Sequence, residues 1–208
     1  MDGLEEDGGK GKSMIIGVIG GVGAGKSSVL DVLTQEYQFT AYRTDDIAKS
    51  FYVHGHPVFE ALKALLGADI ERADGSVDLP AFAAKIYGAG NAKTRAEVDH
   101  IVHPAVWKYV EERVRAARKS GADIVVETAL PTAHFVALCD EVWFVYTEES
   151  VRIARLMETR GYSEEKARAM IHAQIPDDEY AAMADFVVDN SKTREETQAV
   201  IRSHLLEG

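Results

Sequence analysis

Short apolar runs alternate with amphipathic segments along this chain of 208 residues. The amphipathic segments place apolar residues at helical spacing, as Val29, Leu30, Val32 and Leu33 do after the first apolar run. Two of the later runs are almost continuously apolar, which is typical of parallel strands covered on both faces. Strands separated by helices predict an α/β fold with a parallel sheet of about five strands. The predicted strands cover residues 14–19, 39–42, 123–126, 141–146 and 185–188.

Polar residues predict where three of the later helices begin. Thr147 is expected to cap the helix that follows the fourth strand, and Ser163 is expected to start another helix. Thr193-Arg194-Glu195-Glu196 fits a capping box that opens the last helix.

Two helical segments interrupt this alternation. Residues 47–120 show no strand signal, and about 75 residues are far more than one crossover helix needs. We therefore predict a helical insertion over these residues, with a helix start at His103-Pro104 because proline suits the first helical position. A second, smaller helical segment at 151–183 is predicted to form a lid. The predicted nucleotide-binding core comprises the remaining residues, 14–46, 121–150 and 184–208.

Composition and charge narrow the classes of partner. Hydrophobic residues make up 46% and charged residues 27%, which are globular values. The net charge of −11 argues against a general binder of nucleic acid or of anionic membranes, which would need a positive surface. No apolar run is long enough to span a membrane, and residues 1–13 predict a disordered tail rather than a signal peptide. The single cysteine, Cys139, excludes an intrachain disulfide and favours a buried structural thiol in a reducing, cytoplasmic compartment.

The strongest chemical signal is the sequence Gly20-Gly21-Val22-Gly23-Ala24-Gly25-Lys26-Ser27, which lies between a predicted strand and a predicted helix. It fits the pattern G-x-x-x-x-G-K-[ST] of a phosphate-binding loop, in the context that this motif requires. The glycines let backbone N–H groups turn inward around oxyanions, and the helix start adds the positive end of its dipole. We expect Lys26 to neutralise the β- and γ-phosphates, Ser27 to coordinate Mg²⁺ and Ser28 to contact the α-phosphate. A glycine-rich turn is the alternative, and the motif does not separate ATP from GTP.

Three further candidates follow predicted strands, at the sheet edge where ligands of open parallel sheets bind. Asp45 is the candidate general base for an acceptor hydroxyl, with a helix N-cap as the alternative, whereas Asp46 fits the N-cap better. Glu127 is a candidate for a substrate or metal-water contact, or for a structural acid at the end of the sheet. Asn190 is a candidate for contact with the nucleotide base, and turn chemistry explains it almost as well.

Arg152, Arg155 and Arg160 lie in the predicted lid, the first two at a spacing that shares one helix face. Phosphoryl transfer needs cations over the migrating group, and a mobile lid that carries arginine supplies them while excluding water. We therefore expect at least one of these arginines in the site. A solvated helix face is the alternative.

The order of these motifs resembles the dephospho-coenzyme A kinase family over nearly all of residues 14–202. Many kinases share the glycine-rich loop, so the more specific matches are IVHP at 101–104, RLMETRGYSEEKARAMIHAQ at 155–174 and ADFVVDN at 184–190. The resemblance implies a P-loop kinase fold with a helical CoA-binding insertion and a lid. It also implies transfer of the γ-phosphate of ATP, with Mg²⁺, to the ribose 3′-hydroxyl of dephospho-CoA, the last step of coenzyme A biosynthesis. No nucleic acid, membrane or obligate protein partner is implied.

The same resemblance assigns roles to individual residues. The family's acid for the acceptor hydroxyl matches Asp45, its lid arginines match Arg155 and Arg160, and its His-Pro matches His103-Pro104 beside the acceptor pocket. The chain departs from the family pattern at three places in the acceptor region. Arg43 stands where members often carry a second aspartate, and Leu79 where they usually carry an arginine. Pro131-Thr132-Ala133 stands where members often read Leu-Leu-x-Glu.

Two other functions stay open, and the departures motivate the first of them. One is a P-loop kinase that acts on another nucleoside or small alcohol. The other is a nucleotide-dependent switch that hydrolyses slowly, against which stand the missing base-reading N-K-x-D motif and the large helical insertion.

Overall fold

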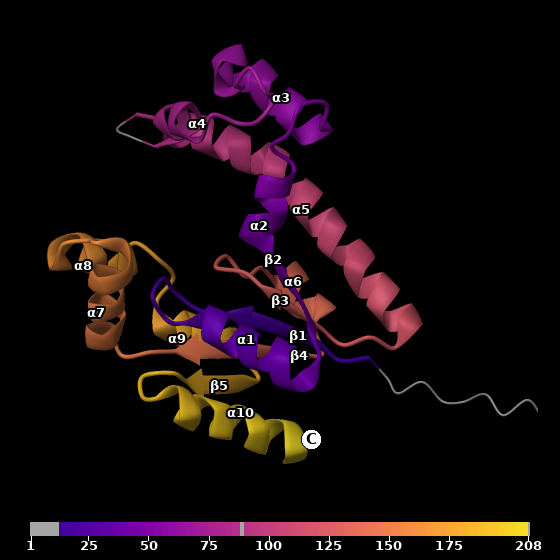
Figure 1. The fold of residues 1–208 in the computed structure, drawn as a ribbon, viewed down its shortest axis with the longest axis vertical. Helices are drawn as coiled ribbons and strands as arrows, with labels where there is room; N and C mark the ends of the chain where they lie inside the picture. The colour runs from indigo at the N-terminus through magenta and orange to yellow at the C-terminus, as the bar shows by residue number, and fades with distance from the viewer. Residues whose placement is uncertain (1–12, 88–89, 208) are drawn as a thin grey trace, which may run out of the picture. The chain divides into compact units, whose positions relative to one another are not determined.

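A computed structural model describes residues 13–87 and 90–207 (Figure 1), so the predicted tail at 1–13 lies outside the described residues except for Ser13. The chain forms two compact units. The first, called the sheet unit, runs to Ala41 and resumes at Val114, and the second, called the helical unit, is Tyr42–Arg113. The predicted lid at 151–183 is part of the sheet unit in this division, and Asp45 is part of the helical unit.

The predicted α/β fold with a five-stranded parallel sheet is confirmed. The strand order is β2-β3-β1-β4-β5, and β1 pairs in parallel with β3 and β4 on its two sides. The chain therefore reverses its direction of winding around β1, the point at which such sheets bind ligands. The strands are β1 (Ile15–Ile19), β2 (Thr40–Arg43), β3 (Ile124–Glu127), β4 (Glu141–Tyr146) and β5 (Phe186–Asp189).

Four of the five predicted strands begin one residue too early, and aspartates explain two of these differences. Asp123, Asp140 and Asp185 each precede a strand, and their carboxylates accept backbone N–H bonds from the neighbouring strand. The accepted bonds come from Met14 at 2.7 Å, Ile15 at 2.8 Å and Val142 at 2.8 Å. A carboxylate that accepts N–H bonds satisfies donors that a sheet leaves free where its strands begin. Asp123 and Asp185 were included in the predicted strands, but they act from outside them.

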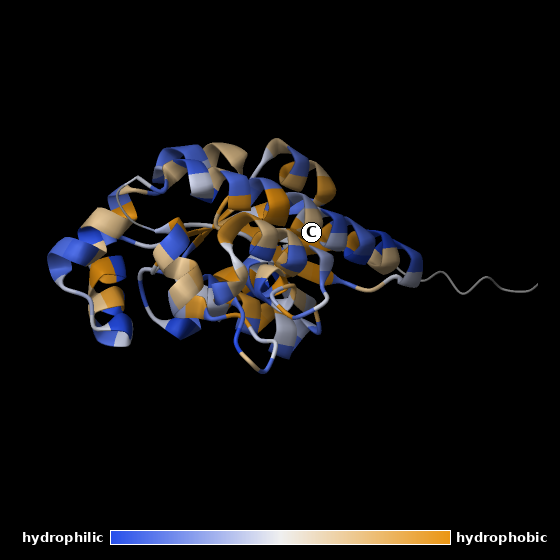
Figure 2. Ribbon diagram, turned by 90° about the horizontal axis from the view of Figure 1, so that it is seen from above, coloured by the Kyte–Doolittle hydropathy of each residue, from blue (hydrophilic) through white to orange (hydrophobic). Residues whose placement is uncertain are grey.

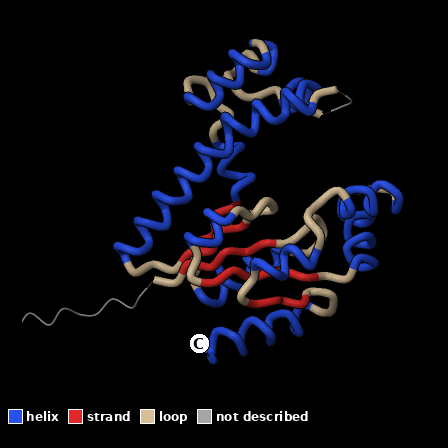
Figure 3. The backbone as a smooth tube through the Cα atoms, turned by 180° about the vertical axis from the view of Figure 1, so that it is seen from behind, coloured by secondary structure: helices blue, strands red, loops and turns tan. Residues whose placement is uncertain are grey.

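Helices cover both faces of the sheet (Figures 1 and 3). Side chains alternate between the faces of a strand, so Ile16 and Val18 share one face of β1 and Gly17 lies on the other. Ile16 and Val18 belong to a core cluster with α1 (Lys26–Tyr37) and α10 (Arg194–Glu207). Gly17 packs under Phe135 of α6 (Ala133–Leu138), and Phe144 of β4 stacks on Tyr180 of α9 (Asp177–Met183), with ring centroids 5.4 Å apart. Figure 2 shows the hydrophobic residues concentrated in the strands, with both hydrophobic and hydrophilic residues on the helices.

Two predicted helix starts are confirmed by their caps. The Ser163 hydroxyl accepts from the N–H of Lys166 at the start of α8 (Glu164–His172). Before α10, Thr193 and Glu196 exchange side-chain to backbone bonds of 3.1 and 3.2 Å, which is a capping box.

The helical unit contains α2 (Thr44–Ser50), α3 (Pro57–Leu66), the 3₁₀ turn Ala68–Ile70, α4 (Leu79–Ile86) and most of α5 (Ala92–Ser120). The predicted helix start at His103-Pro104 is wrong, because α5 begins at Ala92 and contains Pro104 in its interior. Proline costs a helix one hydrogen bond, but burial of a continuous apolar stripe offsets that cost. The stripe crosses the proline at helical spacing and consists of Val98, Val102, Val106 and Val110. Within the described ranges, no helix has both the length and the apolar character needed to cross a bilayer.

The close packing of Gly17 yields a stability prediction. A Cβ atom at this position would lie 2.6 Å from Cζ of Phe135 and 2.7 Å from Sγ of Cys139. We expect Gly17→Ala to lower the free energy of unfolding by about 1–3 kcal/mol, measured by urea denaturation, because overpacking forces buried groups to move. In a Phe135→Leu background, Gly17→Ala should lower the free energy of unfolding by a smaller amount. Additive losses in the double variant would contradict the packing argument.

Candidate active site

The loop between β1 and α1 presents unpaired backbone donors. Gly23 and Gly25 have φ angles of 76° and 84°, which only glycine adopts at little cost, and this confirms the reason for glycine at these positions. The turn is closed by a bond from the N–H of Ala24 to the carbonyl of Gly21 at 3.3 Å. Around the start of α1, the N–H groups of Gly23, Gly25, Lys26 and Ser27 donate to no acceptor among the described residues. Such a group of free amides at a helix start is an anion-binding arrangement.

Lys26 lies across the beginning of this loop. Its ammonium donates to the carbonyls of Gly20 at 2.9 Å and Gly21 at 3.3 Å. The same ammonium lies 3.3 Å from Oε1 of Glu127, the last residue of β3. The structure therefore brings two of the predicted site residues, Lys26 and Glu127, into one ion pair beside the loop. Glu127 reaches it because β3 is paired with β1, where Glu127 is opposite Val18.

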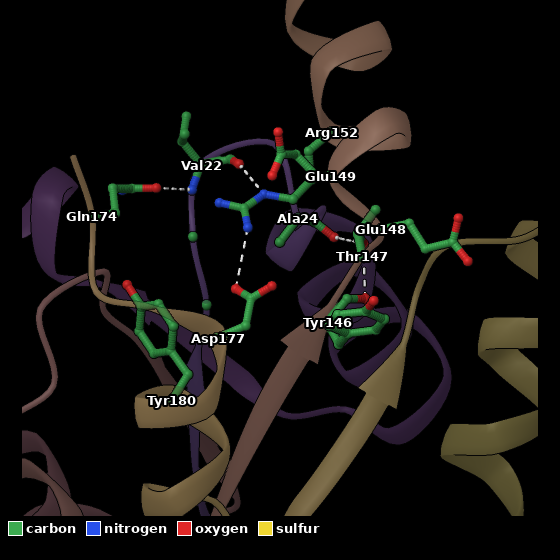
Figure 4. Close-up of polar contacts among 12 residues, drawn as sticks. Val22, Ala24, Tyr146, Thr147, Glu148, Glu149, Arg152, Gln174, Asp177 and Tyr180 are labelled. Carbon is green, nitrogen blue, oxygen red and sulfur yellow. Dashed lines mark hydrogen bonds and ion pairs between the residues drawn. The ribbon is translucent and has the colours of Figure 1, made fainter. Parts of the chain in front are cut away.

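The carbonyl of Ala24 is held from outside the loop by three side chains. It accepts from the Thr147 hydroxyl at 2.8 Å, from Nδ2 of Asn190 at 2.8 Å and from the Arg155 guanidinium at 3.5 Å. Thr147 was expected to cap the helix that follows it, but the cap position of α7 (Glu149–Arg160) is Glu148, and the buried Thr147 hydroxyl faces Ala24 and its own neighbour Tyr146 instead (Figure 4). A carbonyl fixed outward leaves the adjoining amides directed toward the loop interior.

Asn190 is buried and holds the loop with its side chain. Its Nδ2 donates to Ala24, and its Oδ1 accepts from the Thr197 hydroxyl at 2.9 Å. Its backbone carbonyl accepts from the Arg155 guanidinium at 2.8 Å. Both ends of the amide are thus engaged with protein, which gives Asn190 a positioning role beside the loop.

The three arginines of α7 have different surroundings. Arg152 is buried, and its Nε donates to the carbonyl of Val22 at 2.9 Å. Arg155 is half-buried against Ala24 and Asn190, and Arg160 is exposed at the end of the helix. The predicted shared face of Arg152 and Arg155 is confirmed, since both guanidinium groups contact loop carbonyls. Ser27 is exposed on the first turn of α1, and the N–H of the next residue, Ser28, donates to the Gly25 carbonyl at 2.9 Å.

The remaining candidates belong to the helical unit. Asp45 and Asp46 are exposed in the first turn of α2, and neither is its N-cap, because that position is Arg43 and no side chain caps the helix. The N-cap interpretation of both aspartates is therefore wrong. His103 is exposed on α5, with Nε2 3.6 Å from Oδ1 of Asp99. Burial raises the pKa of Tyr52 to about 12, with smaller contributions from Tyr87 and from the negative charges of Asp99 and Asp45, so this hydroxyl remains protonated at neutral pH.

Comparison with known proteins identifies the family of this chain. The sequence model of the family described as dephospho-CoA kinase matches residues 14–196. The chain belongs to the dephospho-CoA kinase family. A protein named dephospho-CoA kinase from Carboxydothermus hydrogenoformans is 35% identical over 189 residues, which cover 90% of each chain. A solved structure from Thermus thermophilus superposes with a TM-score of 0.74 at 23% identity, covering 94% of this chain and 97% of the other. The structure titled dephospho-CoA kinase from Campylobacter jejuni gives 0.65 at 20% identity and the same coverage, and both share the fold.

The structure describes all three places at which the sequence was expected to depart from the dephospho-CoA kinase pattern. Arg43 ends β2 and precedes α2, and Leu79 is 53% exposed at the start of α4. Thr132 caps α6, where its hydroxyl accepts from the N–H of Phe135 at 3.1 Å. At this third place the chain therefore has a capped helix start.

Cys139 lies apart from this chemistry. Burial, with a smaller contribution from the negative charge of Asp140, raises the pKa of its thiol to about 12. The thiol donates to the carbonyl of Phe135 at 3.4 Å. Cys139 is half-buried rather than buried as predicted, and the raised pKa disfavours the thiolate needed for reactivity, in keeping with a structural thiol.

Sequence reasoning did not single out as site residues Thr147 and Gln174, which touch the loop, or Asp177, which pairs with Arg152. Gln174 is the last residue of the 155–174 segment that resembles the family, but that match did not assign it a role, and Asp177 belongs to none of the matched segments. Thr147 follows β4 at the carboxyl edge of the sheet, and that position is the one signal that was available.

Thr147 provides a prediction for the loop. Thr147→Val keeps the volume but removes the donor to Ala24, so we expect the free energy of unfolding to fall by about 1–2 kcal/mol. ATP binding, measured by calorimetry, should weaken in the same variant. Thr147→Ser keeps the hydroxyl and is the matched control, which should bind ATP as the native protein does. Equal ATP affinity in the valine and serine variants would remove the hydroxyl from the support of the loop.

Proposed function

We propose that this chain transfers the γ-phosphate of ATP to the ribose 3′-hydroxyl of dephospho-CoA, giving CoA and ADP. The observation that carries the proposal is the group of four free amides beside Lys26, in a chain of the dephospho-CoA kinase family. The amides and the ammonium supply a local positive potential in a protein of net charge −11. A triphosphate satisfies this arrangement because its oxygens accept from several converging donors at once.

In the proposed reaction, the acceptor 3′-oxygen forms a bond to the γ-phosphorus while the bond from that phosphorus to the β,γ-bridging oxygen breaks. The electron pair of the broken bond remains on ADP. Asp45 takes the hydroxyl proton, and Lys26 neutralises charge on the transferring group. Support for Asp45 comes from its place in the TDDIA sequence directly after β2, which matches the acid of the family.

We assign positioning and binding roles to the other predicted residues. Arg155 and Asn190 hold the nucleotide side of the loop at Ala24, while the exposed Arg160 is the arginine free to reach the transferred phosphate. His103 contacts the acceptor from α5. Glu127 keeps the Lys26 ammonium beside the loop and is a candidate for acceptor contact.

Mg²⁺ fits the residues present as a partner of the bound nucleotide. Among the described residues, no group of three or more His, Cys, Asp or Glu side chains can hold a metal ion. Mg²⁺ often keeps several waters and binds through one or two protein ligands and substrate phosphates, so the exposed Ser27 hydroxyl beside the free amides suits it. When bound, the ion supplies charge neutralisation between the β- and γ-phosphates. For the compartment, we propose the reducing cytoplasm, in keeping with one cysteine held as a thiol.

A coupled assay tests the function. Purified protein receives ATP, Mg²⁺ and dephospho-CoA, and CoA and ADP are both measured. We expect equimolar CoA and ADP from the native protein and a severe loss in Lys26→Ala. ADP formation with other alcohols in place of dephospho-CoA would support the second function, which the departures at Arg43, Leu79 and Thr132 motivate. Tight ATP binding without any acceptor-stimulated turnover would support a nucleotide-dependent switch.

The role of Asp45 is tested separately. Asp45→Asn keeps the shape but removes the base, so kcat should fall by about 10²–10⁴ while ATP affinity is retained. Asp46→Asn is the matched control, because Asp46 is the next residue of α2 and its carboxylate pairs with Lys49 at 3.5 Å. We expect native kcat in that control. Native kcat in Asp45→Asn would remove Asp45 from the mechanism.

A further inference from the structure

Val22 is bound by the 151–183 segment at both of its backbone polar groups. Its N–H donates to Oε1 of Gln174 at 2.6 Å, and its carbonyl accepts from Nε of Arg152 at 2.9 Å (Figure 4). The phosphate-loop motif places no demand on the side chain at this position, yet the valine side chain also packs against a buried apolar cluster. That cluster consists of Ile153, Leu156, Ala167 and Ile171 of α7 and α8.

The Arg152 guanidinium is committed to this contact. The residue is 4% exposed, and its NH1 lies 3.2 Å from Oδ1 of Asp177 at the start of α9. A Cβ atom added to Gly21 would collide with the guanidinium, so the loop backbone lies directly against it. The next loop glycine also lies against α7, though less tightly, since a Cβ at Gly23 would lie 3.1 Å from the carbonyl oxygen of Arg152 and 3.3 Å from Cγ of Leu156. A buried guanidinium that is paired in this way has donors directed at protein, in contrast to the exposed Arg160.

We propose that Arg152 and Gln174 are positioning residues that fix the phosphate loop at Val22, and that ATP affinity therefore depends on helices α7 to α9. The proposal rests on the proposed function in so far as the loop binds the phosphates of ATP. A glycine-rich loop loses much conformational freedom when it is ordered around a ligand. Contacts that order the loop before ligand arrives reduce that cost, so they strengthen binding without touching the ligand.

Gln174 offers the cleaner test, because its side chain is not part of the ion pair between Arg152 and Asp177. Gln174→Met keeps the length but removes the acceptor, whereas Gln174→Glu keeps an acceptor for the N–H of Val22. We expect the methionine variant to bind the β,γ-imido analogue of ATP about 10-fold more weakly, measured by calorimetry, and the glutamate variant to recover part of that loss. The KM for ATP should rise in the methionine variant while kcat and the KM for dephospho-CoA change little.

Hydrogen exchange provides a readout that general destabilisation would not move. In Gln174→Met, the amide of Val22 should exchange faster, while the amides of β1 keep their protection and the midpoint of thermal unfolding stays unchanged. Arg152→Met should weaken binding of the analogue similarly. Arg168→Met is its control, because Arg168 belongs to α8 but pairs with the exposed side chains of Glu149 and Glu164. If Arg152→Met does not fold, the Gln174 variants carry the test alone.

Each result has a definite meaning. Native analogue affinity together with native exchange at Val22 in Gln174→Met would overturn the positioning role. A native protein that fails to bind the analogue at all would instead overturn the proposed function, so the two failures are distinguishable. Weaker binding in Arg168→Met that equals the loss in Arg152→Met would also overturn the proposal.

Discussion

The outward fixation of the Ala24 carbonyl is the constraint on which the rest of the site depends. A loop rich in glycine has no intrinsic reason to keep its amides pointing inward. Thr147, Asn190 and Arg155 supply that reason, because they occupy the carbonyl from outside and come from the ends of two strands and from a helix. Residues at the carboxyl edge of the sheet therefore determine the direction in which the backbone amides of the loop donate.

The positive potential that attracts phosphate is confined to the loop in this acidic protein. The chain as a whole is acidic, and three of the cations nearest the loop, Lys26, Arg152 and Arg155, are engaged by protein oxygens. Backbone amides carry no net charge, so they attract phosphate without the desolvation cost of additional buried cations. An acidic protein can bind a polyanion in this way because the attraction is confined to one short loop.

Local sequence was sufficient to predict the sheet, the loop and two helix caps, because each depends on neighbouring residues. It failed where distant contacts decide the outcome. Pro104 lies inside α5 because a buried valine stripe outweighs the lost hydrogen bond, and Asp123 serves the neighbouring strand rather than its own. The contacts of Val22 with Gln174 join residues 152 positions apart, and no local pattern contains that information. Membership of a family identified the chemistry, but it did not reveal which side chains hold the loop in place.

The most direct test of this account is the response of the loop amides to ligand. Two-dimensional ¹H–¹⁵N spectra of the native protein would be recorded during titration with the β,γ-imido analogue of ATP and Mg²⁺. The account predicts that the four free amides, those of Gly23, Gly25, Lys26 and Ser27, show large downfield shifts as they begin to donate to phosphate oxygens. Saturation of the protein with the analogue while these four resonances stay in place would contradict it.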